Sequence, residues 1–301
     1  MLAELETVDV RGKLAFDEPM MSYNTWGVGG RAQCVFQPAD MADLQSFLKQ
    51  YEGALPLFWM GLGSNVLIPD EGLSGIVVVS HPGLQKICYA DDYSVYVEAG
   101  VACSKLARSS VKQGLQGVEF MAGIPGTVGG ALAMNAGAFG GTTWQHVRSL
   151  QVITRAGEVQ QRPADVFDVS YRSVEIAADE WFVAAYFQLA PTQQDEAPVS
   201  IRDLLAKRNH SQPIGEKNCG SVFKNPPGQF AAKIIEECGL KGLKIGGAEV
   251  SPKHANFIIN TGQASATDIA QLMLQIMSTV KTQYGIELEP EVRILGGMEW
   301  R

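Results

Sequence analysis

The chain has 301 residues, too many for one ordinary hydrophobic core, and its length predicts two or three domains. Hydrophobic residues make up 46% and charged residues 19%, which excludes an intrinsically disordered chain. The net charge of −8, from 24 basic and 32 acidic residues, makes nucleic acid and anionic membranes poor partners, and we expect neither.

The cysteines and the first residues indicate a cellular compartment. The five cysteines form no CxxC pair, so we expect reduced thiols rather than a disulfide framework or a zinc site: Cys34, Cys88, Cys103, Cys219 and Cys238. The N-terminal sequence MLAELETVDVRGK is acidic and lacks the apolar core of a signal peptide. No run of about 18 apolar residues is present. These features predict a cytoplasmic protein without a membrane span.

The first third of the chain contains two glycine turns. The turn at 27–30 precedes an expected strand at 34–36, which is the wrong order for the dinucleotide fingerprint that its glycines imitate. Asp40 is expected to cap a helix with Leu44, Phe47, Leu48 and Tyr51 on its apolar face. A buried strand at 56–60 leads into the second turn, GLGSN at 61–65, and another buried strand follows at 76–79. The second turn could direct N–H groups at a pyrophosphate or be an ordinary turn.

The middle of the chain, residues 81–190, predicts an α+β unit with an antiparallel sheet. A strand at 94–98, a helix at 104–113 closed by Gly114, and a strand at 181–189 are expected. The segments 147–154 and 159–162 flank Ala156-Gly157 and predict a hairpin.

Glycine is most concentrated in GVEFMAGIPGTVGGALAMNAGAFGG, residues 117–141. Glycine loses more backbone entropy on folding than any other residue, so this density implies left-handed backbone or a closely approaching ligand. Glu119 is the single ionisable residue in the segment. A large, flat, partly apolar ligand with an anionic tail would suit it, with a tightly turned loop as the alternative.

The last third begins after a polar segment, APTQQDEAPVS at 190–200, which we interpret as a linker. A helix is expected at 201–207, and a second one buries Phe230, Ile234, Ile235 and Cys238 before Gly239. After a buried strand at 257–259, Ser265 and Asp268 predict the start of a long helix. Its core stripe is Ile269, Leu272, Met273, Ile276 and Val280. The segment 286–295 is expected to be a strand, with Pro290 at an edge or an end.

Familiar catalytic and metal motifs are absent from the sequence, including HExxH, GxxxxGK[ST] and GxSxG, so we expect no metal. The four histidines are far apart, and we expect structural roles for them. Three polar stretches stand out instead: Tyr171-Arg172 after a strand-like 166–169, NCGSVFKNP at 218–226, and ELEPEVR at 287–293. Each could also be a surface ion pair or a turn.

A set of motifs in fixed order resembles the UDP-N-acetylenolpyruvoylglucosamine reductase (MurB) family of peptidoglycan synthesis. They are the glycine turn at 27–30, GLGSNV at 61–66, GIPGTVGGALAMNAGAFG at 123–140, SYR at 170–172, GSVFKNP at 220–226, KHANFIIN at 253–260 and LEPEVR at 288–293. The resemblance runs from about residue 22 to about residue 296 and is specific as an ordered set. The short segment between Arg172 and Ser221 is similar to the class that lacks a tyrosine-bearing insertion. Cys219 departs from the family pattern, where a small residue such as Ala is common.

The resemblance implies an α+β fold with a two-part FAD-binding module of the vanillyl-alcohol-oxidase (PCMH) type and a C-terminal α+β substrate domain. The implied domains are 1–80 and 81–195 for FAD and 196–301 for substrate. The FAD would be non-covalent, NADPH would be the co-substrate, and no oligomer is required. The implied FAD-binding residues are Gly61, Gly63, Ser64, Asn65, Gly123, Ile124, Pro125, Gly126, Thr127, Gly130 and Ala131.

The family's reaction, as the resemblance implies it, is the reduction of UDP-N-acetylglucosamine enolpyruvate to UDP-N-acetylmuramate for the cell wall, and so for cell shape and division. Hydride passes from flavin N5 to C3, and C2 then carries negative charge next to the carboxylate. Arg172 would clamp that carboxylate, a protonated Glu291 would donate to it, and Ser221 would give its proton to C2. Substrate contacts would come from Tyr171, Lys224 and Asn225.

Two other functions remain open from the residues alone. One is a sugar or alcohol oxidase on the same flavin scaffold, although GLGSNV lacks the histidine to which covalent members of that superfamily link flavin. The other is a nucleotide-binding regulatory module, which would bind flavin without turnover and would not need a proton donor.

Overall fold

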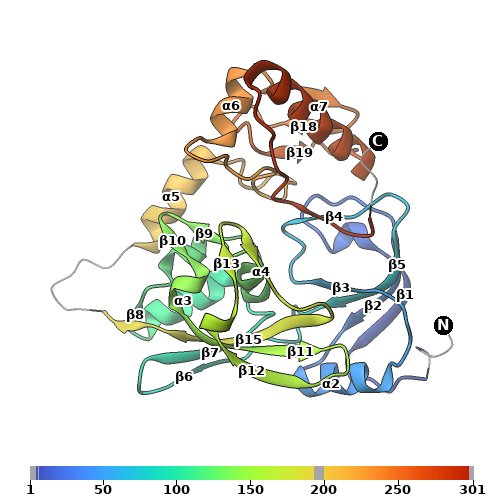
Figure 1. The fold of residues 1–301 in the computed structure, drawn as a ribbon, viewed down its shortest axis with the longest axis vertical. Coiled ribbons are helices and arrows are strands. Elements are labelled where there is room, and N and C mark those ends of the chain that lie inside the picture. Colours follow the sequence, from blue (N-terminus) through green and yellow to red (C-terminus); the bar gives the residue numbers. More distant parts are fainter. Residues whose placement is uncertain (1–4, 6, 193–199, 298–301) are drawn as a thin grey trace. The chain divides into compact units, whose positions relative to one another are not determined.

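The computed structural model describes residue 5, residues 7–192 and residues 200–297 (Figure 1). The chain forms two compact units. Unit 1 is Met1–Ala15, Cys34–Leu62 and Ile76–Ala206, and unit 2 is Phe16–Gln33, Gly63–Gly75 and Lys207–Arg301. The three-domain division with boundaries at 80 and 195 stays a prediction. The predicted linker falls mostly on residues 193–199, which lie outside the described residues.

A five-stranded antiparallel sheet with the order β12-β11-β15-β7-β6 forms much of unit 1. Its strands are β6 Ile87–Tyr89, β7 Ser94–Glu98, β11 Val147–Thr154, β12 Val159–Pro163 and β15 Glu180–Gln188. Side chains alternate between two cores, because Leu150 and Val152 face one cluster while Ile153 and Val183 face another. The predicted antiparallel sheet and its hairpin are confirmed. The helix α4 (Val128–Ala133) packs on β7 and β15, and α3 (Cys103–Lys112) packs on η2 (Glu119–Gly123).

A second sheet has the strand order β1-β2-β5-β3. The strands are β1 Lys13–Pro19, β2 Arg31–Gln37, β3 Leu57–Met60 and β5 Leu73–Val79, with β3 and β5 parallel. The predicted helix is present as α2 (Met41–Gln50), and its Phe47 stacks on Phe36 with ring centres 4.1 Å apart. Of β3 only Met60 is buried, which corrects the prediction of a fully buried strand, because β3 lies at the sheet's edge.

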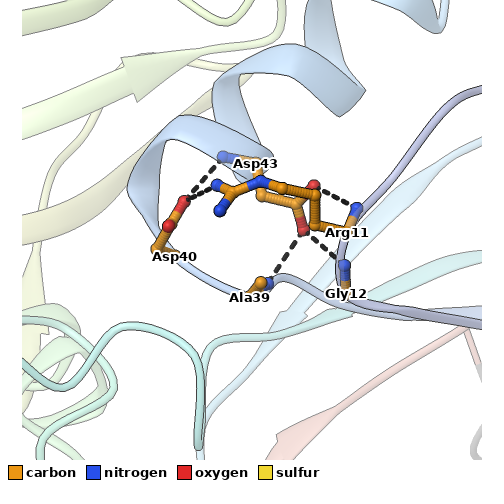
Figure 2. A network of polar contacts seen from close by, with 5 residues as sticks. All are labelled: Arg11, Gly12, Ala39, Asp40 and Asp43. Atoms are coloured by element: carbon orange, nitrogen blue, oxygen red, sulfur yellow. Dashed lines mark hydrogen bonds and ion pairs between the residues drawn. The ribbon is translucent and has the colours of Figure 1, made fainter.

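The first turn of α2 also fixes the N-terminal segment (Figure 2). Asp40 caps the helix as predicted, accepting a hydrogen bond from the Asp43 N–H at 2.9 Å, and it pairs with the Arg11 guanidinium. Asp43 is buried, and its carboxylate accepts from the backbone N–H groups of Arg11, Gly12 and Ala39 at 2.7–2.9 Å. The bond from Arg11 lowers the pKa of Asp40 below its ordinary range.

Unit 2 is built around the long helix α7 (Ala266–Tyr284), which packs on β17 (Lys244–Ile245) and β18 (Ala248–Val250). The strand β19 (Ile258–Asn260) completes that sheet, and α6 (Ala231–Glu237) also contacts α7 (Figure 1). The predicted core stripe is confirmed, since all five side chains are inaccessible to solvent. Ser265 and Asp268 form the predicted capping box, and Asp70 accepts from the N–H groups of Ala266 and Thr267.

The remaining elements are the helix α5 and several short strands and 3-10 helices. They are η1 Met20–Ser22, β4 Val66–Leu67, β8 Leu115–Gln116, β9 Gly137–Ala138, β10 Gly141–Thr142, η3 Thr143–His146, η4 Ala164–Val166, β13 Val169–Ser170, β14 Ser173–Val174, β16 Ala190–Pro191, α5 Ile201–Ser211 and β20 Arg293–Ile294. None of the helices in the described ranges is long and apolar enough to span a membrane.

Three local predictions are wrong. The segment 286–295 contains only the two-residue strand β20 and one isolated bridge at Pro290, because its backbone groups bond to separate partners rather than to one neighbouring strand. The expected strand at 166–169 is instead the end of η4 followed by β13. Phe230 precedes α6 and is 68% exposed, so it does not share the buried helix face.

Candidate active site

The second and third glycine segments meet in unit 1 at Gly61 and Thr127. A Cβ atom added to Gly61 would lie 2.2 Å from Thr127 Oγ1, so only glycine permits this approach. Thr127 caps α4, and the bonds Val128 N–H to Val101 O and Cys103 N–H to Gly126 O, at 2.8 and 3.0 Å, fix its position. Gly126 itself has φ +131°. Two predicted cofactor-binding segments that are distant in sequence are therefore in contact, with the backbone of Gly61 against the side chain of Thr127.

The second turn continues into unit 2 from Gly63 onward. Gly63 has φ +62°, and a Cβ there would collide with the Tyr23 carbonyl oxygen at 2.0 Å. The Asn65 side-chain amide donates to the Glu291 carbonyl at 3.1 Å, and the Asn65 carbonyl accepts from the Arg293 N–H at 3.0 Å. Asn65 therefore holds the chain that carries Glu291.

Arg172 occupies the tip of a two-residue hairpin turn in unit 1, between β13 and β14. Its backbone has φ +56°, a left-handed conformation that L-residues other than glycine adopt at a cost. The guanidinium donates to the Gly137 carbonyl at 3.1 Å and to the Asn135 carbonyl at 3.5 Å. It also lies over the exposed Tyr171 ring, 5.3 Å from its centre. The predicted arginine is thus held against the glycine-rich segment in an uncommon conformation.

Ser221 lies in unit 2, and the residues that follow it are hydrogen-bonded on both sides. On one side, the N–H of Lys224 bonds to Glu289 O at 2.8 Å and the N–H of Glu291 bonds to Val222 O at 2.7 Å. On the other side, the buried Asn256 side chain accepts from the Phe223 N–H at 3.0 Å and donates to the Phe223 carbonyl at 2.8 Å. The asparagine side chain thus makes the two hydrogen bonds to the Phe223 backbone that a neighbouring strand would make in a sheet. Ser221 follows Gly220, which has φ +83°.

Glu291 lies close enough to Cys219 to affect the pKa of the Cys219 thiol. Cys219 is buried, and burial raises the pKa of its thiol well above the ordinary value, to which Glu291 adds whenever its carboxyl group is ionised. The thiol beside Ser221 therefore stays protonated and unreactive at neutral pH.

The predicted substrate contacts Lys224 and Asn225 already have protein partners. Lys224 Nζ lies 2.5 Å from Glu289 Oε1, with side chains that are 20% and 68% exposed. The side-chain oxygen of Asn225 accepts a hydrogen bond from the N–H of Ala231, the first residue of α6, at 3.0 Å. A diphosphate at Lys224 would have to compete with Glu289.

Comparison with known proteins identifies the family. A family model described as UDP-N-acetylenolpyruvoylglucosamine reductase, C-terminal domain, matches residues 212–295, and one described as FAD binding domain matches residues 32–161. The chain is 50% identical over 285 residues to the UDP-N-acetylenolpyruvoylglucosamine reductase of Alkalilimnicola ehrlichii, covering 95% of each chain. It is 47% identical over 306 residues to the enzyme of that name from Coxiella burnetii, covering 95% of this chain and 97% of the relative.

The chain belongs to the UDP-N-acetylenolpyruvoylglucosamine reductase family. A solved structure of the Thermus caldophilus member (MurB) matches with a TM-score of 0.78 and 30% identity, covering 95% of this chain and 99% of that one. The predicted α+β fold and the FAD-binding domain are confirmed, and the chain is a flavin-dependent oxidoreductase.

The residues that this reductase presents near α4 fit a flavin nucleotide. Ile124, Pro125 and Gly126 have small or apolar side chains and are at least partly exposed. The acidic Glu119 is buried and accepts from the Gly117 N–H at 2.8 Å, so its carboxylate is engaged within its own loop. Gly130 of α4 is exposed, and the one atom near the position of a Cβ there is Thr127 Oγ1 at 3.9 Å, so this backbone is open to the close approach of a diphosphate.

Sequence reasoning about this reductase missed two asparagines. Asn256 lies in KHANFIIN and Asn135 in the glycine-rich segment, and the sequence predicts no role for either. Their partners lie 33 and 35 residues away, so no local pattern indicates them. The one feature of the sequence that points to these asparagines is that each lies inside a family motif.

Proposed function

We propose that the chain reduces the enolpyruvyl group of UDP-N-acetylglucosamine enolpyruvate with NADPH, which yields UDP-N-acetylmuramate for peptidoglycan. The observation that supports this most strongly is 47–50% identity over 95% of the chain to reductases named for that substrate. The cofactor would be held without a covalent bond by the glycine turn at 61–65 and by residues 123–131.

FAD held by these residues would supply hydride transfer from NADPH to the vinyl carbon C3 of the substrate. The remaining requirements fall on side chains of this chain. When C3 gains the hydride, the electron pair of the C2–C3 double bond moves to C2 and is shared with the carboxylate. That charge must be stabilised, and C2 must then gain a proton.

Arg172 is proposed to hold the substrate carboxylate. A guanidinium is always charged, and its planar fork matches two carboxylate oxygens, so it stabilises the extra charge that gathers there. Its bonds to the carbonyls of Asn135 and Gly137 support the role, since they limit rotation of the guanidinium plane. Tyr171 would contact the substrate from the same turn.

Ser221 is proposed to give its hydroxyl proton to C2, and a protonated Glu291 to donate a hydrogen bond to the carboxylate. The bonds that run from Glu291 N–H to Val222 O and from Asn256 to Phe223 favour a fixed position for the hydroxyl. The neighbouring Cys219 does not compete for the role, because it is buried and is not exposed to a substrate. Lys224 and Asn225 would contact the diphosphate and sugar.

The Ser221→Ala variant tests this assignment. NADPH should reduce the flavin at the normal rate, because that half-reaction needs no proton at C2. Reoxidation by the enolpyruvyl nucleotide should slow by about 10²–10⁴-fold, the usual contribution of a positioned acid. Anaerobic stopped-flow absorbance separates the two steps, and Ser278→Ala, an exposed serine in α7, is the matched control. Normal reoxidation in Ser221→Ala would remove Ser221 from the acid role.

The overall function has a simpler test. The purified protein should be yellow, should release its flavin on denaturation, and should couple NADPH oxidation to consumption of the enolpyruvyl nucleotide. Oxygen consumption with free sugars would instead support an oxidase, and flavin binding without turnover would support a regulatory module.

A further inference from the structure

Asn135 connects the glycine-rich segment of unit 1 to the turn that carries Arg172. Its side-chain amide nitrogen donates to the Ser170 carbonyl at 3.2 Å, and its backbone carbonyl accepts from the Arg172 guanidinium at 3.5 Å. Two residues later, the Gly137 carbonyl accepts from the same guanidinium at 3.1 Å. One short stretch of chain therefore binds both the backbone before Arg172 and the end of its side chain.

The other end of the Asn135 side chain is attached to the core. Its amide oxygen accepts from the Trp144 backbone N–H at 3.3 Å. The Trp144 indole donates to the Leu132 carbonyl at 2.8 Å, and its ring packs at 5.4 Å and 5.9 Å from the rings of Phe167 and Phe182. The Asn135 side chain thus links the backbone of the packed Trp144 to the turn that carries Arg172.

The backbone conformations show that this arrangement is imposed by its surroundings. Asn135 has φ +37° and Arg172 has φ +56°, and both lie in the left-handed region that favours glycine. Asparagine tolerates that region better than most residues, but arginine does not. A strained arginine persists only where neighbouring contacts over-determine it, and strained residues of this kind gather at functional sites.

We propose that Asn135 is the positioning residue of Arg172, setting the plane of the guanidinium that receives the substrate carboxylate. The inference rests on the proposed function, in which Arg172 stabilises the charge that develops at that carboxylate. A guanidinium acts through a flat fork, so a tilt of its plane weakens both bonds to a carboxylate even when the charge stays nearby. Asn135 itself contacts no reacting atom in this proposal.

The Asn135→Gly variant is the sharpest test. Glycine keeps the left-handed backbone and both carbonyls, and it removes only the two side-chain bonds to Ser170 and Trp144. Asn135→Asp is the second variant, since it keeps the size and the acceptor for Trp144 but loses the donor to Ser170. Asp179→Gly is the matched control, because Asp179 is an exposed non-glycine residue of unit 1 with φ +59°.

We expect both Asn135 variants to slow flavin reoxidation by the enolpyruvyl nucleotide by about tenfold, as a small misplacement of a substrate-holding group does. Their affinity for UDP-N-acetylmuramate, measured by calorimetry, should fall by a similar factor. The rate of flavin reduction by NADPH and the FAD dissociation constant should stay within about twofold of normal. The control should leave all four quantities unchanged.

Coupling to Arg172 decides whether Asn135 acts through it. In an Arg172→Lys background, Asn135→Gly should change reoxidation by less than about twofold, because a lysine ammonium has no plane to set. An additive tenfold loss in that background would overturn the inference, as would loss of FAD binding in both Asn135 variants. If Arg172→Lys alone leaves reoxidation normal, the proposed role of Arg172 fails as well. If Arg172→Lys is slow and Asn135→Gly is normal, only the inference fails.

Discussion

The Arg172 turn of unit 1 and the Ser221 segment of unit 2 present their key side chains in opposite ways. At the turn, the functional residue itself adopts the left-handed conformation, with φ +56°. In the segment, Gly220 adopts it at φ +83°, and Ser221, which follows, does not have a positive φ. The cost of the sharp bend is thus borne by an arginine in one region and is avoided by a glycine in the other.

The supporting contacts differ accordingly. The arginine is held at its far end, by backbone carbonyls that accept from its guanidinium. The serine has a short side chain, and its backbone neighbours are held on both sides by Asn256 and by the segment that carries Glu291. A long side chain can be oriented by contacts at its far end, whereas the position of a serine hydroxyl depends mainly on the backbone that carries it. The two regions therefore predict different responses to mutation.

The largest loss of stability should come from Asn256→Ala in the Ser221 segment. The substitution removes both partners of the buried Phe223 backbone, and each unpaired group costs about 1–3 kcal/mol, so the free energy of unfolding should fall by about 3 kcal/mol. Urea denaturation followed by tryptophan fluorescence measures this. Asn209→Ala, at an exposed asparagine of α5, should change it by less than about 0.5 kcal/mol.

Asn256→Ala should also affect the chemistry, since it loosens the backbone beside Ser221. Flavin reoxidation by the enolpyruvyl nucleotide should slow while flavin reduction by NADPH stays normal. Full stability of this variant would show that the Asn256 side chain does not hold the Phe223 backbone. The Ser221 segment would then not be supported through its backbone, as the comparison with the Arg172 turn requires.

The next effect should come from Gly220→Ala, which moves the cost of the bend onto a residue with a Cβ atom. No atom lies within 4 Å of the position that this Cβ would take, so the expected loss of about 1–2 kcal/mol comes from the backbone conformation alone. Gly220→Asn should cost less although asparagine is larger, because asparagine tolerates left-handed φ. If asparagine costs more than alanine in thermal unfolding, space rather than φ determines this position.

Sequence predicts the regular parts of this molecule well and its site poorly, for a physical reason. The helix α7 is specified locally, by the Ser265 and Asp268 capping box and by an apolar stripe that repeats every three or four residues. Even so, its predicted C-terminal neighbour at 286–295 is not a continuous strand, because the N–H of Glu291 bonds to Val222 while that of Arg293 bonds to Asn65. Such partners are set by tertiary structure.

The candidate site shows the same limit. The motifs predicted which residues belong to the site, and the structure brings two of them, Gly61 and Thr127, into contact. The left-handed conformation of Arg172 has no signal in the sequence SYR, since arginine is not typical of such positions. The Arg172 guanidinium bonds to the carbonyl of Asn135, which lies 37 residues earlier. The roles of Arg172, Ser221 and Glu291 remain predictions.

A smaller effect should appear on acidification, because burial lowers the pKa of one histidine in each unit. Burial lowers the pKa of His146 below its ordinary value of 6.5, against the opposing charge of Glu119, and burial also lowers the pKa of His254. Below pH 6.5 the unfolded chain binds protons that the folded chain binds only at lower pH. Stability should therefore be complete above that pH and fall as pH decreases.

Thermal unfolding between about pH 7.5 and about pH 5 tests this, with a slope of at most about 1.4 kcal/mol per pH unit for each histidine. His146→Gln and His254→Gln should each make the acid side flatter, and the comparison shows which unit is the more acid-sensitive. His210→Gln, at an exposed position in α5, should leave the curve unchanged. A gain in stability on acidification would contradict the burial argument.

The smallest change in stability should come from Glu289→Gln, which breaks the ion pair with Lys224. Both side chains are partly exposed, so the free energy of unfolding should change by less than about 1 kcal/mol. If Lys224 contacts the substrate diphosphate, removing its competitor should lower KM for the enolpyruvyl nucleotide by about threefold and less so at high salt. Glu287→Gln, whose partner is Lys281, is the matched control and should leave KM unchanged. A higher KM in Glu289→Gln would mean that Glu289 helps to hold Lys224 in place for the substrate, so that this lysine, like Arg172, is oriented from its tip.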